Sequence, residues 1–237
     1  MLIKLLVTDP FDGMLPPGYP DHASLYERLL RPLDPELRIE QFEAYKGVLP
    51  EPSGNPRCLH IITGSRAGVY EPRPWIRSLL QWIRDAKEEG VALAGICFGC
   101  QAIAQALGGR VIHHPNGWGL GLRRSRVVSP RLRAYLPEDT LLLSYDHGDQ
   151  VVELPEGAER LATSDFCTHD AFALGDRILA FQGHPEFPLP YMEWFLGANT
   201  GNESPEFRGK VKESFALGTP QGPAIARMML DLARQAS

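Results

Sequence analysis

The feature that most constrains the fold is an alternation of short apolar runs with amphipathic stretches in the first half of the chain. Residues 2–7, 58–63 and 91–96 are apolar runs with the length of a buried strand. Residues 74–89 place apolar side chains at helical spacing, with a proline at the start and a glycine after the end, which predicts a helix. We therefore expect an α/β fold of three layers, with a mostly parallel central sheet and helices on both faces.

The remainder of the chain extends this prediction. Its length of 237 residues suits one large α/β domain, so residues 1–237 are expected to form a single domain. The other expected elements are a helix over 21–30 with Asp21 as a cap, a helix over 98–107, short strands within 110–165, two strands within 171–182 around Gly175-Asp176, and an amphipathic helix over about 222–235.

Charge and hydropathy argue against several classes of partner. The formal net charge is −5 and no Lys/Arg block forms a basic stripe, so no nucleic-acid partner is expected. Arg123, Arg124 and Arg126 are interpreted as a solvated strand edge. No apolar run approaches the ~18 residues of a membrane span, and the apolar start is too short for a signal peptide. The four cysteines are sparse and do not suggest a disulfide framework, so the expected location is a reducing cytoplasm.

One strand–helix junction has the pattern of a nucleophile elbow. Gly95-x-Cys97-x-Gly99 falls where a predicted strand ends and the next helix begins. The flanking glycines allow a sharp turn that holds the cysteine in a strained conformation with its side chain exposed. The N-terminus of the helix would stabilise a thiolate, and the Phe98 backbone N–H would be free to hold an oxyanion. Cys97 is therefore the candidate nucleophile, and the alternative is a small buried core residue.

Cys97 and Cys100 also form a Cys-x-x-Cys motif, which occurs in redox and zinc sites. A zinc site would need a second Cys/His pair, and Cys167-x-His169 is a weak candidate. In an elbow, Cys100 lies one turn into the helix, where packing is the default. Neither a metal site nor a redox dithiol is therefore expected.

A base for this nucleophile follows another apolar strand, at residues 178–181. Proline disfavours the helical conformation in the residue before it, so His184 in His184-Pro185-Glu186 should be extended. Residues i and i+2 of an extended segment project to the same side. Glu186 can then orient the imidazole while the other ring nitrogen meets Cys97, which is the order of nucleophile, base and orienting group in a triad.

The other histidines rank lower as candidates. His147 lies in the turn-rich stretch 144–149, which suits substrate contact, and it is the alternative base. His113 and His114 are expected to be solvated rather than catalytic.

Several motifs resemble those of the class I, or triad, glutamine amidotransferase family. Residues 95–101 (Gly-Ile-Cys-Phe-Gly-Cys-Gln) and 183–187 (Gly-His-Pro-Glu-Phe) resemble its two signatures, and 61–67 resemble its oxyanion loop. Residues 117–119 and 147–151 also match, so the resemblance covers essentially the whole chain. The chain is most similar to the stand-alone branch, which is related to the glutaminase domain of GMP synthase and includes γ-glutamyl peptidases.

The resemblance implies a flavodoxin-like fold and a role for each matched residue. Cys97 would attack a γ-glutamyl amide carbonyl to form a thioester, and His184, held by Glu186, would protonate the leaving ammonia and then activate water. The oxyanion hole would be formed by backbone N–H groups of Phe98, Gly64 and Ser65. The substrate pocket would be lined by Gln101, His147, Gly148 and Asp149. The implied substrate is a small molecule, glutamine or a γ-glutamyl compound, and no metal or cofactor is implied.

Three departures from the family pattern leave the function open. The oxyanion loop reads Gly64-Ser65-Arg66 rather than Gly-Gly-Pro, and Cys100 replaces the usual His or Met, which would alter the pocket shape. Residues 188–237 are too few for an ATP-pyrophosphatase module. The alternatives are a subunit that supplies ammonia to a separate synthase, a self-contained γ-glutamyl hydrolase or peptidase, and a catalytically silent binding or regulatory module. The intact triad argues against the last.

Overall fold

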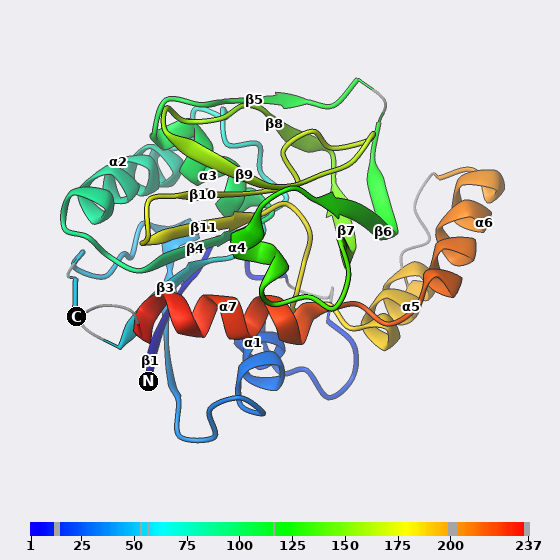
Figure 1. Ribbon diagram of the computed structural model, residues 1–237, viewed down its shortest axis with the longest axis horizontal. Helices are drawn as coiled ribbons and strands as arrows, with labels where there is room; N and C mark the ends of the chain where they lie inside the picture. The colour runs from blue at the N-terminus through cyan, green and yellow to red at the C-terminus, as the bar shows by residue number, and fades with distance from the viewer. Residues whose placement is uncertain (12–14, 53, 56, 116, 199–202, 235–237) are drawn as a thin grey trace.

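The computed structural model describes residues 1–11, 15–52, 54–55, 57–115, 117–198 and 203–234. Within these residues a nine-stranded sheet of order β2-β1-β3-β4-β11-β10-β9-β6-β7 forms the centre (Figure 1), and β5 and β8 pair separately. The strands are β1 (Leu2–Val7), β2 (Arg38–Glu43), β3 (Cys58–Ile62), β4 (Leu93–Ile96), β5 (Arg110–His113), β6 (Gly119–Val127), β7 (Thr140–His147), β8 (Asp149–Glu153), β9 (Ala158–Thr163), β10 (Ala171–Leu174) and β11 (Ile178–Phe181). The helices are α1 (Ala23–Leu30), α2 (Pro74–Glu88), α3 (Phe98–Ala106), α4 (Pro130–Arg133), α5 (Leu189–Ala198), α6 (Pro205–Ser214) and α7 (Gly222–Arg234), with short 3-10 turns at Ala44–Lys46 and Phe215–Leu217.

The predicted parallel sheet is confirmed in the half that carries the functional motifs. Strands β2, β1, β3, β4 and β11 all run in the same direction. Strands β10, β9, β6 and β7 continue the sheet as antiparallel neighbours. The strands expected within 110–165 are therefore mostly antiparallel additions to one sheet.

Helices cover both faces of this sheet, as predicted (Figure 1). Leu5 and Leu6 are adjacent in β1 and therefore point to opposite faces. Leu5 packs in a core with residues of α1 and α7, such as Tyr26 and Met229. Leu6 packs in a second core with residues of α2 and α3, such as Ile83. The architecture is thus a three-layer α/β sandwich with a core on each side of the sheet.

Local signals set the helix boundaries. Asp21 Oδ1 accepts the backbone N–H of Ser24 at 2.9 Å and so caps the start of α1, as expected. Gly90 follows α2 with a φ of 63°, a left-handed conformation that costs glycine little. The final predicted helix is α7, and residue 235 lies outside the described part of the chain.

The structure differs from the sequence-based expectation at the arginine-rich run. These residues lie in β6, which is inside the sheet between β9 and β7 rather than at its edge. Arg124 and Arg126 are exposed, but Arg123 is half-buried and lies 4.0 Å from the ring centroid of Phe166. Arg123 packs on an aromatic face instead of facing solvent. The interpretation of the three arginines as a solvated strand edge is therefore wrong.

Among the helices of the described residues, none combines the length and the apolar character required to cross a membrane.

Candidate active site

The motif residues meet at one edge of the central sheet. The oxyanion loop follows β3, Cys97 follows β4, and His184 follows β11. These three strands are adjacent and parallel, so their carboxyl ends lie side by side, where α/β sheets bind ligands. The topology thus brings together segments that are up to 120 residues apart in the sequence, from Gly64 to His184.

Cys97 has the backbone strain expected of a nucleophile elbow. Its φ is 53° and its ψ is −106°, a region that non-glycine residues rarely occupy. Its N–H donates to the Phe181 carbonyl at 2.8 Å, which ties the strained residue to β11. A Cβ atom at Gly95 would lie 2.5 Å from the Gly99 carbonyl oxygen, and one at Gly99 would lie 2.3 Å from that of Ile62. Both positions therefore require glycine.

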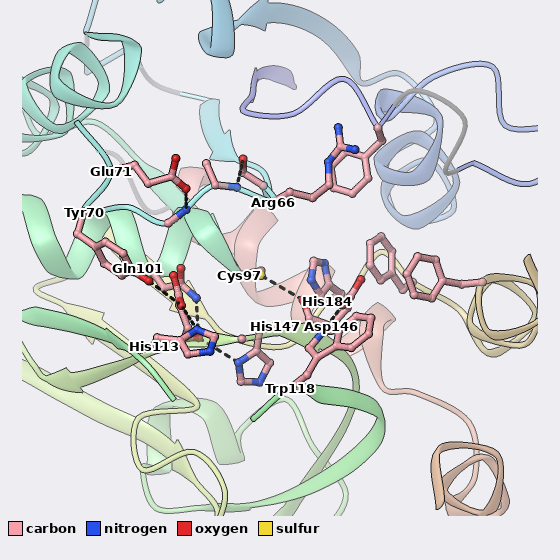
Figure 2. Close-up of a pocket in the computed structure, with 18 residues that line it drawn as sticks. Arg66, Tyr70, Glu71, Cys97, Gln101, His113, Trp118, Asp146, His147 and His184 are labelled. Atoms are coloured by element: carbon pink, nitrogen blue, oxygen red, sulfur yellow. Dashed lines mark hydrogen bonds and ion pairs between the residues drawn. The ribbon is translucent and has the colours of Figure 1, made fainter. Parts of the chain in front are cut away.

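The thiol of Cys97 lies at the N-terminus of α3. The residue is 4% exposed, and its Sγ is 3.7 Å from the carbonyl oxygen of Asp146 (Figure 2). Because Phe98 is the first residue of α3, its N–H has no partner carbonyl within the helix. The geometry therefore allows this N–H to stabilise an anion formed beside the sulfur.

His184 and Glu186 form a buried pair beside Cys97. His184 Nδ1 lies 2.8 Å from Glu186 Oε1, and each residue is 2% exposed. The backbone N–H of His184 donates to the Ser144 carbonyl at 2.8 Å. The His184 ring stacks on Phe187, with 4.0 Å between the ring centroids. His184 Nε2 accepts or donates no hydrogen bond within the described chain, which leaves it available for chemistry.

The electrostatics of this pair favour a charged imidazole. Burial by itself lowers the pKa of His184, but the negative charges of Glu186 and of a Cys97 thiolate outweigh this effect. The pKa of His184 is consequently raised well above its ordinary value. The neighbouring Glu186 carboxylate therefore favours the protonated form of the His184 ring.

Tyr26 is a member of this site that the sequence did not reveal. It comes from α1, is fully buried, and donates its hydroxyl to Glu186 Oε1 at 3.2 Å. Glu186 Oε1 thus receives hydrogen bonds from both His184 and Tyr26. Burial and the neighbouring Glu186 raise the pKa of Tyr26 well above its ordinary value, so the hydroxyl remains a donor. No motif indicates this contact, because it joins residues 160 positions apart.

The oxyanion loop is held by contacts with the end of β1. Thr8 Oγ1 donates to the Gly64 carbonyl at 2.7 Å, and Ser65 Oγ donates to the Thr8 carbonyl at 3.1 Å. Arg66 pairs with Asp9 through two bonds, Nε–Oδ2 at 2.8 Å and NH2–Oδ1 at 2.6 Å. Burial raises the pKa of Asp9, but its hydrogen bonds with Arg66 and Phe11 prevail and lower it. The loop that replaces Gly-Gly-Pro is therefore anchored by an ion pair.

Gly64 brings this loop close to Cys97 and His184. A Cβ atom there would lie 3.0 Å from His184 Cε1 and 3.6 Å from Cys97 Cβ. The structure thus places the predicted oxyanion residue Gly64 beside Cys97 and His184, and Phe98 directly after Cys97 at the start of α3, with Ser65 lining the adjoining pocket.

A pocket of about 470 Å³ opens over Cys97 and is lined by the predicted substrate residues Gln101, His147, Gly148 and Asp149 (Figure 2). Gln101 is 3% exposed, and its amide nitrogen donates to the Asp149 carbonyl at 2.8 Å and to Gln182 Oε1 at 3.2 Å. Gln101 therefore supports the pocket wall as well as lining it. The Asp149 carboxylate accepts from the Tyr70 hydroxyl at 3.1 Å and lies 3.0 Å from His113 Nδ1.

The structure separates the roles of the remaining histidines. Burial lowers the pKa of His147 to about 3, so its imidazole stays neutral and accepts a proton poorly. Its Nδ1 donates to the Asp149 carbonyl at 3.1 Å. His147 is therefore a weaker candidate base than His184. His113 is exposed, as expected, but it also lines the pocket, which the sequence did not indicate.

Cys100 lies in the core rather than in the site. It is fully buried among apolar residues between α3 and the sheet, and burial raises the pKa of its thiol well above the ordinary value. Within the described residues, no group of three or more His, Cys, Asp or Glu side chains is arranged to hold a metal ion.

Comparison with known proteins identifies the family. The model of the family described as glutamine amidotransferase class-I matches residues 62–192, which include the elbow and the His184–Glu186 segment. The chain belongs to the class-I glutamine amidotransferase family. A glutamine amidotransferase-like protein of Schizosaccharomyces pombe is 30% identical over 87% of this chain and 86% of its own length. The solved structure of a glutamine amidotransferase from Methylobacillus flagellatus has a TM-score of 0.72 at 21% identity, covering 99% of this chain and 92% of the other, which supports the shared fold.

Two further relatives have names that specify an activity. Gamma-glutamyl peptidase 3 of Arabidopsis thaliana is 32% identical over 54% of this chain and 53% of its own length. The glutamine-hydrolyzing GMP synthase of Dehalococcoides mccartyi is 35% identical over 56% of this chain and 24% of its own length. The similarity to γ-glutamyl peptidases and to GMP synthase is thus confirmed, and the match spans only part of the length of either relative.

Proposed function

We propose that this chain is a cysteine-dependent hydrolase that cleaves γ-glutamyl amide bonds, including that of glutamine, with Cys97, His184 and Glu186 as its triad. The observation that carries the proposal is the strained Cys97 at the start of α3, beside a buried His184–Glu186 pair whose hydrogen bond is 2.8 Å long. Buried charged pairs are costly unless they have a function or full compensation, so a silent binding module is the weaker explanation.

The reaction proceeds in two steps. The Cys97 thiolate attacks the γ-carbonyl carbon, and N–H groups of Phe98 and of the Gly64-Ser65 loop stabilise the oxyanion. The C–N bond then breaks, the leaving nitrogen takes the proton from the His184 imidazolium, and a γ-glutamyl thioester remains. Water next gives a proton to His184 as it attacks the thioester, the C–S bond breaks, and glutamate leaves with the thiolate restored.

A glutamine-analogue electrophile tests the nucleophile. Intact-mass measurement should show one adduct on the wild type and none on Cys97→Ala, because only an activated thiolate in the pocket reacts quickly. Cys100→Ala is the matched control and should keep the adduct, since its sulfur is buried in the core. His184→Ala should remain folded and react at least roughly 100-fold more slowly. Equal labelling of Cys97→Ala would overturn the assignment.

A second function, supply of ammonia to a separate synthase, uses the same chemistry. The sequence similarity to a GMP synthase motivates it. Glutamine turnover that is negligible alone and rises when a synthase is added would favour this function. Release of glutamate from γ-glutamyl conjugates without any partner would favour a self-contained hydrolase.

A further inference from the structure

The pocket has two sides relative to Cys97. Figure 2 shows Gln101, His113, Tyr70 and Glu71 on one side of the sulfur, and His184, Asp146 and Trp118 on the other. We call the second side the leaving-group lobe. It is lined by Trp118, Asp146 and His184, and by Phe187, which stacks on His184.

The chemistry decides which part of a substrate enters this lobe. His184 must give its proton to the leaving nitrogen, so that nitrogen lies on the His184 side of the sulfur. Any group attached to the nitrogen then extends along the same side, and the glutamyl carbon chain extends along the opposite side. Ammonia, the leaving group of glutamine, carries no substituent and would leave this lobe empty.

Aromatic rings line the lobe beside His184. Phe187 stacks on His184 at 4.0 Å and on Tyr191 at 4.3 Å between ring centroids. Trp118 precedes β6, and Phe187 follows β11, so the rings come from separate parts of the chain. The faces of such rings attract organic cations as well as apolar groups.

One carboxylate, that of Asp146, lies in the lobe with the imidazole of His184. Asp146 is half-buried, and its Oδ1 accepts the indole N–H of Trp118 at 2.8 Å, which fixes its orientation. Its Oδ2 receives no hydrogen bond from the described chain. Burial raises the pKa of Asp146, and it outweighs the positive charge of His184 and the Trp118 hydrogen bond, which lower it. A bound cation would compensate further for this buried charge. Arg66, the arginine that lines the pocket, pairs with Asp9.

We infer that the lobe binds the leaving amine of a γ-glutamyl conjugate whose substituent ends in a cation, such as an ammonium group. This inference rests on the proposed γ-glutamyl hydrolase function and specifies its substrate class. In the first step the amide C–N bond breaks and the leaving nitrogen takes the proton of His184. The distal cation stays with Asp146 and the aromatic rings until the amine leaves. A leaving group that ends in a carboxylate is disfavoured, because two negative charges would share the lobe.

Three conjugates with the same four-carbon chain test the inference. These are γ-glutamyl-1,4-diaminobutane, γ-glutamyl-butylamide and γ-glutamyl-4-aminobutyrate, whose tails are cationic, neutral and anionic. Glutamate release should give the highest kcat/KM for the cationic tail, at least roughly tenfold above the anionic one. Asp146→Asn keeps an oxygen acceptor for Trp118 and should reduce this ratio to near one. Asp176→Asn is the control, since it removes the same charge from a 94% exposed side chain in the turn before β11, at the opposite end of that strand.

The outcomes separate the two proposals. Equal kcat/KM for the three tails in the wild type, or an unchanged ratio in Asp146→Asn, overturns the inference about the lobe alone. The wild-type ratio stands as a test even if the variant does not fold. If no γ-glutamyl compound is cleaved and the glutamine-analogue electrophile forms no adduct with Cys97, the proposed hydrolase function fails as well.

Discussion

At the scale of single residues, the site depends on side chains that hold other side chains in position. Glu186 accepts from His184 and Tyr26 through the same oxygen, while its Oε2 has no partner in the described chain. Tyr26 therefore limits the positions that the carboxylate can take. Groups that orient a catalytic histidine in this way commonly affect turnover more than binding.

Tyr26→Phe removes only the hydroxyl and tests this positioning role. We expect kcat to fall by roughly tenfold with KM nearly unchanged, because the substrate contacts remain while Glu186 loses one of its two donors. Steady-state kinetics with glutamine or a γ-glutamyl amide measures the split.

Tyr135→Phe is a matched control for this change. Its hydroxyl donates to the Asp231 carboxylate at the same distance, 3.2 Å, but it lies away from the pocket. It should leave kcat unaffected. An equal loss in both variants would indicate that general destabilisation, rather than positioning of Glu186, explains the effect.

At the scale of elements, the elbow depends on close packing between β3, β4 and α3. Gly99, in the first turn of α3, lies against the backbone of Ile62 in β3. The Gly99 N–H donates to the Thr63 carbonyl at 3.2 Å, which joins the helix to the oxyanion loop. This contact fixes the distance between Cys97 and that loop.

Gly99→Ala should separate these elements. Its Cβ would lie 2.3 Å from the Ile62 carbonyl oxygen, so the helix must shift, and we expect a loss of about 2–3 kcal/mol in the free energy of unfolding. Urea denaturation measures the change. Gly209→Ala in α6 is the control, because a Cβ there meets nothing within 4 Å and should be neutral or slightly stabilising. Wild-type stability in Gly99→Ala would show that the elbow tolerates the added methyl group.

The sequence predicted some elements better than others. β1 and α2 have strong periodicity and clear ends, and the structure places them within one residue of the prediction. α5 is apolar without a strong polar face, and β2 is a half-exposed edge strand rich in charged residues, so neither has a clear period. In the fold, β2 pairs with β1, and α5 contributes Phe195 to an apolar core.

At the scale of the whole molecule, buried histidines couple stability to pH. Burial, with a smaller contribution from Lys4, lowers the pKa of His60 to about 4, and burial lowers that of His22 to about 4. Both are neutral in the folded protein, whereas in the unfolded chain they titrate near the ordinary value of 6.5. Between these values the unfolded state binds more protons, so the free energy of unfolding falls as the pH falls from 6.5 towards 4.

His60→Leu should reduce this acid sensitivity. Between pH 7 and pH 4.5 the wild type should lose about 2 kcal/mol more than the variant, because the variant no longer has a buried imidazole to protonate. Urea denaturation at the two pH values provides the comparison. Parallel pH curves for the wild type and His60→Leu would contradict the prediction.

The sequence by itself determined the features that depend on neighbours in the chain. The strand–helix order predicted the layers, the glycines around Cys97 predicted the elbow, and the spacing of His184 and Glu186 predicted their pairing, because each follows from local backbone geometry. Only the tertiary structure decided that Tyr26 supports Glu186, that Asp9 anchors the oxyanion loop, and that Asp146 and the aromatic rings share a lobe beside His184. These contacts join residues that are far apart in the sequence. They depend on the order of strands in the sheet and on the packing of the antiparallel strands and helices around it, which no local pattern specifies.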